Sequence, residues 1–502
     1  MRYILPTVSG SDVAKNTLYL TIASVGQKLL SFVYFLLIAR VMKPEATGGY
    51  FLALSVITVA LVVSDFGTNS VIIREVAKKP DDVGLVRRAL ALKLLTTILG
   101  SAFAFLAATT LGYAPDVRTL VLLAVAVMAA DTFSQFYYGV LRGLRRLGYE
   151  SVGLFVGMGS TLAVGSLSLA FSPTLPMLIL ALFVGSAFNL AFAATMAARR
   201  LGSMVLVPTF DLSGSRPLLR AAFPFLLAGL FVKVYSYVDV QFLNHYLGPS
   251  AVGVYSIAYK YTYAFQFLPL AFVAALYPGM SARVGKDPAG LARLFERAVW
   301  YMLLLAMPLA FGLWAIAGSA VALVGPEYAA AAPVLGLFAF VLIPAFLDFP
   351  VGSLLNAAGR QGTKTAIFGI VMAVNALLNW LLIPRFGMMG AAAASVTSTW
   401  VLVVCGLRFV PAIIPGYRVS QIIPTFARML LSGAVMASCA RLSSDTFGAG
   451  VVGLVAAVAV GAATYVAMLF VTGAVKRTDL RELVGLFRKK EASYAPAPAV
   501  DA

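Results

Sequence analysis

Lys28 and Lys233 carry the clearest chemical signal in this sequence, because each lies near the middle of a strongly apolar stretch. The two positions correspond: the stretch covering residues 21–50 recurs in altered form 205 residues later, over residues 226–255. A lysine is costly inside a membrane, so each is expected to face protein, water or a ligand. Two ammonium groups on matching helices could bind one anionic group between them. The sequence therefore predicts a two-lobed transporter whose halves share a cationic cavity.

Hydroxyl-bearing residues accompany both lysines on the same helix face. In the first copy, Ser24 and Ser31 fall within about 80° of Lys28 around the helix axis. In the second copy, Ser236 and Tyr237 lie on the face that carries Lys233. The lysines could bind an anionic group while the hydroxyl groups form hydrogen bonds with polar parts of the same ligand. We therefore predict one substrate-binding site, made of Lys28, Lys233, Ser24, Ser31, Ser236 and Tyr237.

The composition requires a membrane protein built from helices. Hydrophobic residues make up 61% of the 502 residues and charged residues 12%, about half the share that is usual in soluble domains. Apolar windows long enough to cross a bilayer as helices recur along the chain. We predict an all-α polytopic protein with about fourteen spans: 18–39, 49–69, 91–111, 118–140, 152–171, 176–197, 222–243, 252–275, 298–317, 330–350, 365–384, 389–410, 425–442 and 449–472.

The lysines and arginines behind the net charge of +18 are unevenly divided between the two sides of the membrane. Placing both termini in the cytoplasm puts most of the 38 lysines and arginines on the cytoplasmic side, and the opposite orientation would reverse that bias. The charge thus indicates topology, and nucleic acid is not an expected partner. The predicted location is the cell membrane.

A second repeat supports a duplication of the whole first half. Arg146-x-Gly148 recurs as Arg360-x-Gly362, at nearly the same offset as the first repeat. Six crossings return the chain to its starting side, so the two copies have parallel topology. The predicted units are an N-terminal lobe (1–198), a cytoplasmic linker (199–221), a C-terminal lobe (222–410), two added spans (411–473), and a basic amphipathic helix with a disordered tail (474–502).

Further charged residues are candidates for gating or ion coupling: Asp65, Asp131, Asp239, Asp348 and Lys260. Asp131, Asp239 and Asp348 could bind a coupling proton or sodium ion. Asp65 is expected instead to pair with a cation of a loop or helix end. Asp239 is expected to form a structural ion pair with Lys260, which should lie at a similar depth.

The residues that metal and redox chemistry require are sparse. Cys405 and Cys439 lie inside predicted spans and form no CxxC pattern, and His245 is the one histidine. Acidic residues cluster only at Asp81-Asp82, in a basic loop. The sequence therefore predicts no metal site and no cofactor.

Three segments resemble the polysaccharide transporter family, the oligosaccharide-lipid flippases of the multidrug/oligosaccharidyl-lipid/polysaccharide exporter superfamily. They are Ala39-Arg40-x-x-x-Pro44-x-x-x-Gly48-x-Tyr50, the segment from Asp65-x-Gly67 to Arg74, and the segment from Asn379 to Ala394. The resemblance implies a V-shaped fold of two lobes that moves lipid-diphosphate-linked glycans to the outer leaflet by alternating access. The family's cationic cavity residues correspond in kind and place to Lys28 and Lys233.

The functional hypothesis is a flippase for a polyprenyl-diphosphate-linked oligosaccharide, serving assembly of cell-surface polysaccharide or glycoconjugate. Its expected partners are that lipid-linked oligosaccharide, membrane lipids and polysaccharide assembly enzymes. A multidrug or cation antiporter of the same superfamily is the first alternative, although it would favour acidic residues in the cavity. A membrane enzyme acting on lipid-linked glycans is the second, and it would need a large extramembrane loop or an acidic metal-binding cluster.

Overall fold

The computed structural model describes residues 10–211, 215–448 and 450–475. Within these ranges the chain is almost entirely helical and contains no β-strand, which confirms the all-α prediction. An apolar chain in lipid must satisfy its own backbone hydrogen bonds, and helices do so within each segment. The predicted basic helix and tail at 474–502 lie outside the described residues from residue 476 onward.

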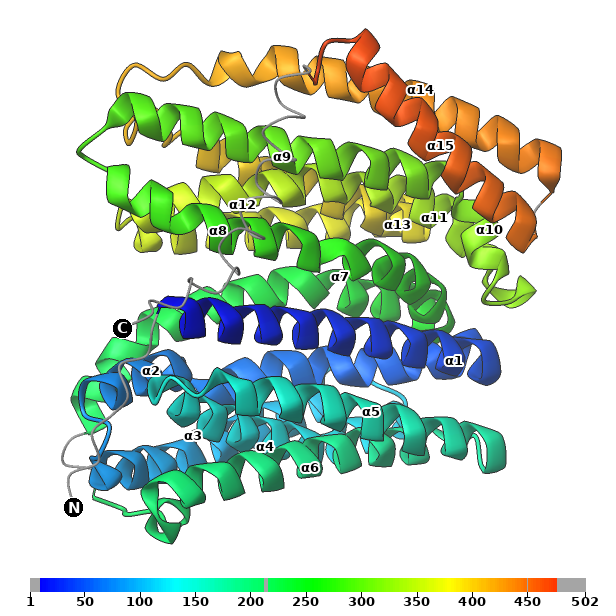
Figure 1. Ribbon diagram of the computed structural model, residues 1–502. Coiled ribbons are helices and arrows are strands. Elements are labelled where there is room, and N and C mark those ends of the chain that lie inside the picture. Colours follow the sequence, from blue (N-terminus) through cyan, green and yellow to red (C-terminus); the bar gives the residue numbers. More distant parts are fainter. Residues whose placement is uncertain (1–9, 212–214, 449, 476–502) are drawn as a thin grey trace, which may run out of the picture.

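The helices form two groups that lie one above the other in Figure 1. The N-terminal group contains α1 (Gly10–Asp65), α2 (Thr68–Lys78), α3 (Val83–Thr110), α4 (Pro115–Gly143), α5 (Leu147–Phe171) and α6 (Leu175–Leu201). The C-terminal group contains α7 (Ser215–Tyr263), α8 (Phe267–Arg283), α9 (Pro288–Ala315), α10 (Ala317–Ala322), α11 (Ala331–Phe338), α12 (Leu342–Ala357), α13 (Gln361–Leu407), α14 (Ile422–Phe447) and α15 (Val451–Val471).

Three of the long helices are hairpins, each broken at one residue with non-helical backbone angles. The breaks fall at Lys43 in α1 (φ 59°), Gly248 in α7 (φ 82°) and Gly387 in α13 (φ 57°). Proline follows directly at Pro44 and Pro249, where its ring cannot continue the preceding helix. The duplicated sequence motif therefore codes for a duplicated bend.

Contacts between the two arms show that each hairpin folds back on itself. In α1 the rings of Phe35 and Phe51 lie 6.0 Å apart. In α7 the rings of Tyr237 and Tyr259 lie 5.9 Å apart. In α13 the side chains of two residues 23 positions apart, Asn375 and Ser398, share a hydrogen bond of 2.8 Å.

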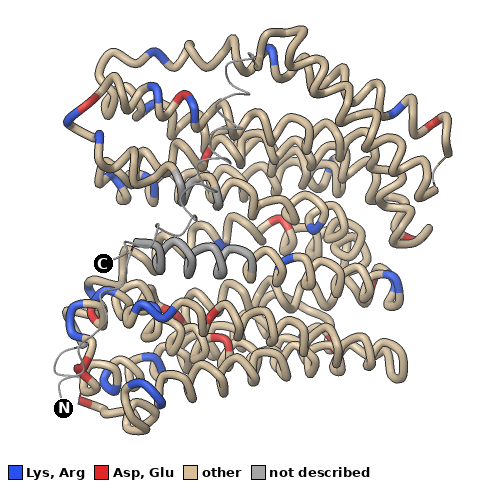
Figure 2. The backbone as a smooth tube through the Cα atoms, viewed as in Figure 1, with Lys and Arg blue, Asp and Glu red and all other residues tan. Residues whose placement is uncertain are grey.

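Eleven helices among the described residues are long and apolar enough to cross a membrane, and three of these are the hairpins. Counting each hairpin arm as a span would reach the expected fourteen, but that number stays a prediction. The end of the molecule at which α1 and α7 bend, at Lys43 and Gly248, is called the hairpin end below. Figure 2 shows most lysines and arginines gathered at the opposite end of the helices.

Candidate functional site

The N-terminal and C-terminal groups meet along α1 and α7, which lie side by side (Figure 1). Between them is a cavity of about 430 Å³, within the range of small-molecule sites. Lys28 and Ser31 of α1 line it from one side, and Lys233, Ser236 and Tyr237 of α7 from the other. The structure thus brings five of the six predicted substrate-binding residues to one cavity.

The sixth residue, Ser24, is not among those that line the cavity. It lies one helical turn before Lys28 on α1. Lys28 and Lys233 each lie 15 residues before the bend of their helix. At 1.5 Å per residue this places both about 22 Å from the hairpin end, so the duplication sets the two cations at equal depth.

Three lysines give the cavity its charge. Lys260, from the second arm of α7, lines it together with Lys28 and Lys233. Lys28 acts on Lys233 as a like charge across the boundary between the two groups. Asp348, the one acidic residue in the described part of the lining, is paired with Lys364 at 3.4 Å. Among the described residues the cavity is therefore strongly cationic.

The expected ion pair between Asp239 and Lys260 is wrong. The ammonium of Lys260 lies 4.9 Å from the ring centre of Phe35 and 5.7 Å from that of Phe51, both in the N-terminal group. Asp239 points the other way: its carboxylate accepts hydrogen bonds from the hydroxyl of Tyr255 and from its neighbour's backbone N–H. A similar depth along two neighbouring helices, which stays a prediction, does not fix the direction in which a side chain points.

The other acidic candidates lie away from the cavity lining. Asp65 forms an ion pair of 2.7 Å with Lys93 of α3, whose side chain is 1% exposed and also donates to Thr68. Asp65 therefore has a cationic partner, as expected, but that partner lies buried within α3 rather than in a loop or at a helix end. Asp131 of α4 accepts a hydrogen bond from Ser186 of α6. Both helices belong to the N-terminal group, so Asp131 lies within that group and not in the cavity lining.

Tyrosines form the part of the lining that sequence reasoning missed. The rings of Tyr259 and Tyr263 of α7 pack against each other, tilted by 41° with their centres 4.3 Å apart, and Tyr235 hydrogen-bonds Thr399 of α13. Helical spacing of four residues, from Tyr255 through Tyr259 to Tyr263, was the available signal. Rings with hydroxyl groups suit a ligand that is both polar and bulky.

The hairpin end is closed by direct backbone contact between the two copies of the repeated motif. A Cβ atom on Gly48 would lie 1.8 Å from the carbonyl oxygen of Pro249. A Cβ atom on Gly253 would lie 1.8 Å from the carbonyl oxygen of Pro44. The contact is reciprocal, as a twofold relation between the groups requires. Only glycine allows the helices to approach this closely.

Polar and aromatic contacts continue this closure toward the cavity. Thr47 of α1 hydrogen-bonds the hydroxyl of Tyr328 at 2.8 Å. Gln241 of α7 accepts a hydrogen bond from Tyr113 and donates one of 2.9 Å to Ser55. Nearer to the cavity, the ring of Phe51 packs against Tyr237 and Tyr259, which line the cavity. We call these contacts, together with the Gly48–Gly253 contact, the hairpin-end seal.

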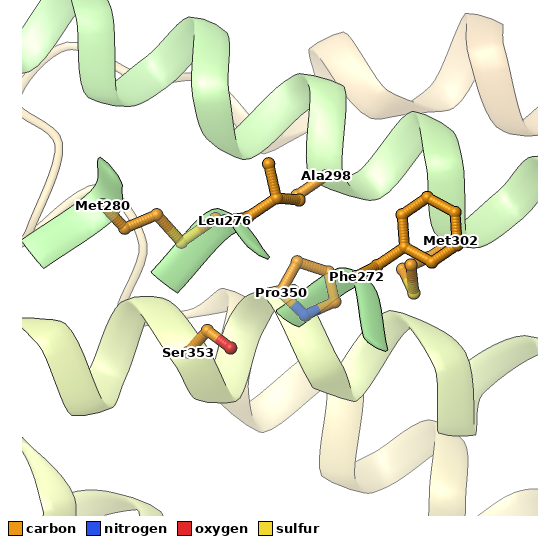
Figure 3. A pocket seen from close by; sticks show the side chains of 7 residues that line it. All are labelled: Phe272, Leu276, Met280, Ala298, Met302, Pro350 and Ser353. Atoms are coloured by element: carbon orange, nitrogen blue, oxygen red, sulfur yellow. The ribbon is translucent and has the colours of Figure 1, made fainter. Parts of the chain in front are cut away.

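A second, much smaller cavity of about 10 Å³ lies within the C-terminal group. Figure 3 shows Phe272 and Leu276 of α8, Ala298 and Met302 of α9, and Ser353 of α12 around it. Its volume is about that needed for one water molecule, and the Ser353 hydroxyl already donates to the carbonyl oxygen of Phe349. This is a packing gap rather than a binding site.

Comparisons with known proteins show which family models and which relatives this chain matches. A family model described as "Polysaccharide biosynthesis protein" matches residues 13–283, and a second, "MatE", matches residues 224–381. The succinoglycan biosynthesis transport protein ExoT of Rhizobium meliloti is 25% identical over 99% of this chain and 100% of its own length. The probable low-salt glycan biosynthesis flippase Agl15 of Haloferax volcanii is 24% identical over 77% of this chain and 81% of its own.

The fold is also found among solved structures. The lipid II flippase MurJ in an inward closed conformation aligns with a TM-score of 0.72 and 14% identity, covering 89% of this chain and 97% of MurJ. At that identity the likeness shows the fold. Because the first family model covers more than half of the sequence, this multi-pass membrane transporter belongs to the polysaccharide biosynthesis protein family.

Proposed function

We propose that this protein is a flippase that moves a polyprenyl-diphosphate-linked oligosaccharide from the cytoplasmic to the outer leaflet by alternating access. The observation that carries the proposal is the cavity between α1 and α7, whose described lining contains three lysines and a single, paired carboxylate. A cavity of that charge, enclosed by two lobes, suits an anionic cargo.

Each part of such a cargo has a matching environment. The diphosphate would lie between Lys28 and Lys233, where attraction of a few kcal/mol per ammonium gives affinity without trapping the ligand. Ser31, Ser236 and Tyr237 would form hydrogen bonds with the sugars nearest the diphosphate. The polyprenyl chain is apolar and can stay in the bilayer while the head group crosses.

The hairpin end would be the outer face. This assignment follows from the excess of lysine and arginine at the opposite end, which favours the cytoplasm in the cell membrane. The hairpin-end seal would then keep the cavity from the outside until the lobes move apart. An inside-negative potential would favour outward movement of an anion by about 2.3 kcal/mol per charge per 100 mV. Coupling to a proton or sodium ion at Asp131, Asp239 or Asp348 stays a prediction.

The relatives support the same cargo class. The name of ExoT describes transport in succinoglycan biosynthesis, and that of Agl15 describes a probable flippase in glycan biosynthesis. By analogy, this protein would deliver its cargo to enzymes that assemble a surface polysaccharide or glycoconjugate.

A cation antiporter is the second candidate, because the "MatE" model matches residues 224–381 and Asp348 reaches the cavity. Proteoliposomes containing the wild-type protein separate the two. We expect protein-dependent movement of a labelled polyprenyl diphosphate oligosaccharide and no exchange of protons for a fluorescent organic cation. Proton-coupled uptake of the cation, with no movement of the lipid, would favour the antiporter.

A further inference from the structure

Asp348 poses a problem for a cavity that binds a diphosphate. It is the acidic residue of the lining, and its side chain is 17% exposed. An unpaired carboxylate there would repel an anionic cargo and attract cations, since like charges in a partly desolvated cavity interact strongly. The selectivity of the cavity therefore depends on what neutralises Asp348.

The structure places one ammonium group against this carboxylate. Lys364, in the first turn of α13, lies with Nζ 3.4 Å from Oδ2 of Asp348 on α12. Lys364 is not itself a lining residue of the cavity. Its ammonium group therefore pairs with Asp348 without being part of the cavity lining.

The helix that carries Asp348 also makes room for that ammonium group. Gly352 follows Asp348 by one helical turn, and a Cβ atom there would lie 1.8 Å from Nζ of Lys364 and 2.9 Å from its Cε. The Lys364 ammonium thus occupies the space that any side chain at position 352 would fill. The ring of Phe368, one turn further along α13, lies 5.7 Å from Nζ and borders the cavity. The ion pair with Asp348, the missing side chain at Gly352 and the ring of Phe368 therefore together position the Lys364 ammonium group.

We propose that Lys364 is a positioning residue that sets the charge preference of the cavity by neutralising Asp348. With the pair intact, Lys28, Lys233 and Lys260 present an uncompensated positive charge to the cargo. Without Lys364, the negative charge of Asp348 offsets the positive charge of one cavity lysine. The free carboxylate then also offers cations a group to bind. The proposal rests on the function proposed above, and it names the residue pair that keeps this cavity from preferring the cargo of a cation exporter.

The test measures a preference rather than transport alone. Purified full-length protein is titrated with two probes, inorganic diphosphate and the organic cation tetraphenylphosphonium, and the ratio of the two affinities is recorded. Lys364→Gln is expected to lower this anion-over-cation ratio by about tenfold or more. Asp348→Asn combined with Lys364→Gln is expected to restore the ratio to near the wild-type value. The double variant removes the carboxylate together with the lysine that neutralised it, so the net charge beside the cavity is again that of the wild type.

Two further variants separate charge masking from structural damage. Gly352→Ala should lower the ratio as Lys364→Gln does, because its Cβ atom displaces the ammonium group while leaving every charge present. Arg360→Gln, which removes a positive charge one turn before Lys364, should leave the ratio unchanged. The proposal is overturned if Lys364→Gln does not change the ratio, or if the double variant stays as low as the single one. A wild-type protein that prefers the cation would instead contradict the proposed function.

Discussion

The hairpin-end seal and the cavity are made by the same two helices and differ in almost every physical property. At the seal, α1 and α7 touch through backbone at Gly48 and Gly253, with no room for a side chain between them. In the cavity, the same helices stand apart and present Lys28 and Lys233. One duplicated stretch therefore supplies both a closed contact and a charged chamber, at two depths of one interface.

The difference indicates how duplication of one stretch can supply both the closed contact and the charged cavity of such a transporter. Residues that allow close approach recur five positions after each bend, and costly cations recur 15 positions before it. Small residues stabilise helix contacts in a membrane through packing, whereas lysines are tolerated only where water or a ligand reaches them. Changes at the seal should alter the opening of the hairpin end, and changes in the cavity should alter what is bound.

The largest effect is expected from filling the contact at the seal. Gly48→Ala places a methyl group against the Pro249 carbonyl of the other group, so the closed arrangement must loosen. A cysteine at position 31 in the cavity lining, in a background without Cys405 and Cys439, should then react with a membrane-impermeant thiol reagent added at the hairpin end more than about tenfold faster. Gly253→Ala should do the same because the contact is reciprocal.

The neighbouring glycine supplies the control. A Cβ atom on Gly49 would meet only Val117 of the same group, at 3.4 Å, an ordinary contact distance. Gly49→Ala should therefore leave the labelling rate close to that of the parent. Equal labelling of the Gly48 and Gly49 variants would show that this contact does not hold the hairpin end closed.

A smaller effect is expected from the hydrogen bonds of the seal. Ser55→Ala removes the acceptor of the 2.9 Å bond from Gln241, which joins the two groups. The loss of about 1 kcal/mol should raise opening of the hairpin end by about fivefold. Labelling of the same cysteine at position 31 provides the readout. Thr119→Ala, which removes a bond within α4 alone, should have no such effect.

The smallest effect is expected on stability, when a cavity lysine is changed. Lys28→Gln should shift the free energy of unfolding by less than about 0.5 kcal/mol, because no carboxylate in the described part of the chain pairs with it. Lys93→Gln is the contrasting variant: it leaves the Asp65 carboxylate without its buried partner and should cost about 3 kcal/mol. Thermal unfolding in detergent measures both. Similar losses would mean that Lys28 has a structural role like that of Lys93.

Much of this comparison could be predicted from residue pattern alone. The repeat at 21–50 and 226–255 located both lysines and both bends, because helical periodicity and proline act locally. It did not reveal that Gly48 and Gly253 touch, since contact between two copies depends on how the lobes pack. The partner of Lys260 was also missed: the rings of Phe35 and Phe51 reach it from another helix. Lys93 was not singled out from the sequence, because its burial depends on packing against Asp65 and Thr68.

The most direct test of the cationic cavity is transbilayer movement of a labelled polyprenyl diphosphate oligosaccharide in proteoliposomes that carry the Lys28→Gln/Lys233→Gln variant. We expect movement to fall to the protein-free rate, while Lys28→Arg/Lys233→Arg, which keeps both charges, retains part of it. Equal amounts of folded protein, checked by thermal unfolding, make the rates comparable. Movement at the wild-type rate by the Gln variant would contradict the account, because the cargo would then cross without the paired lysines.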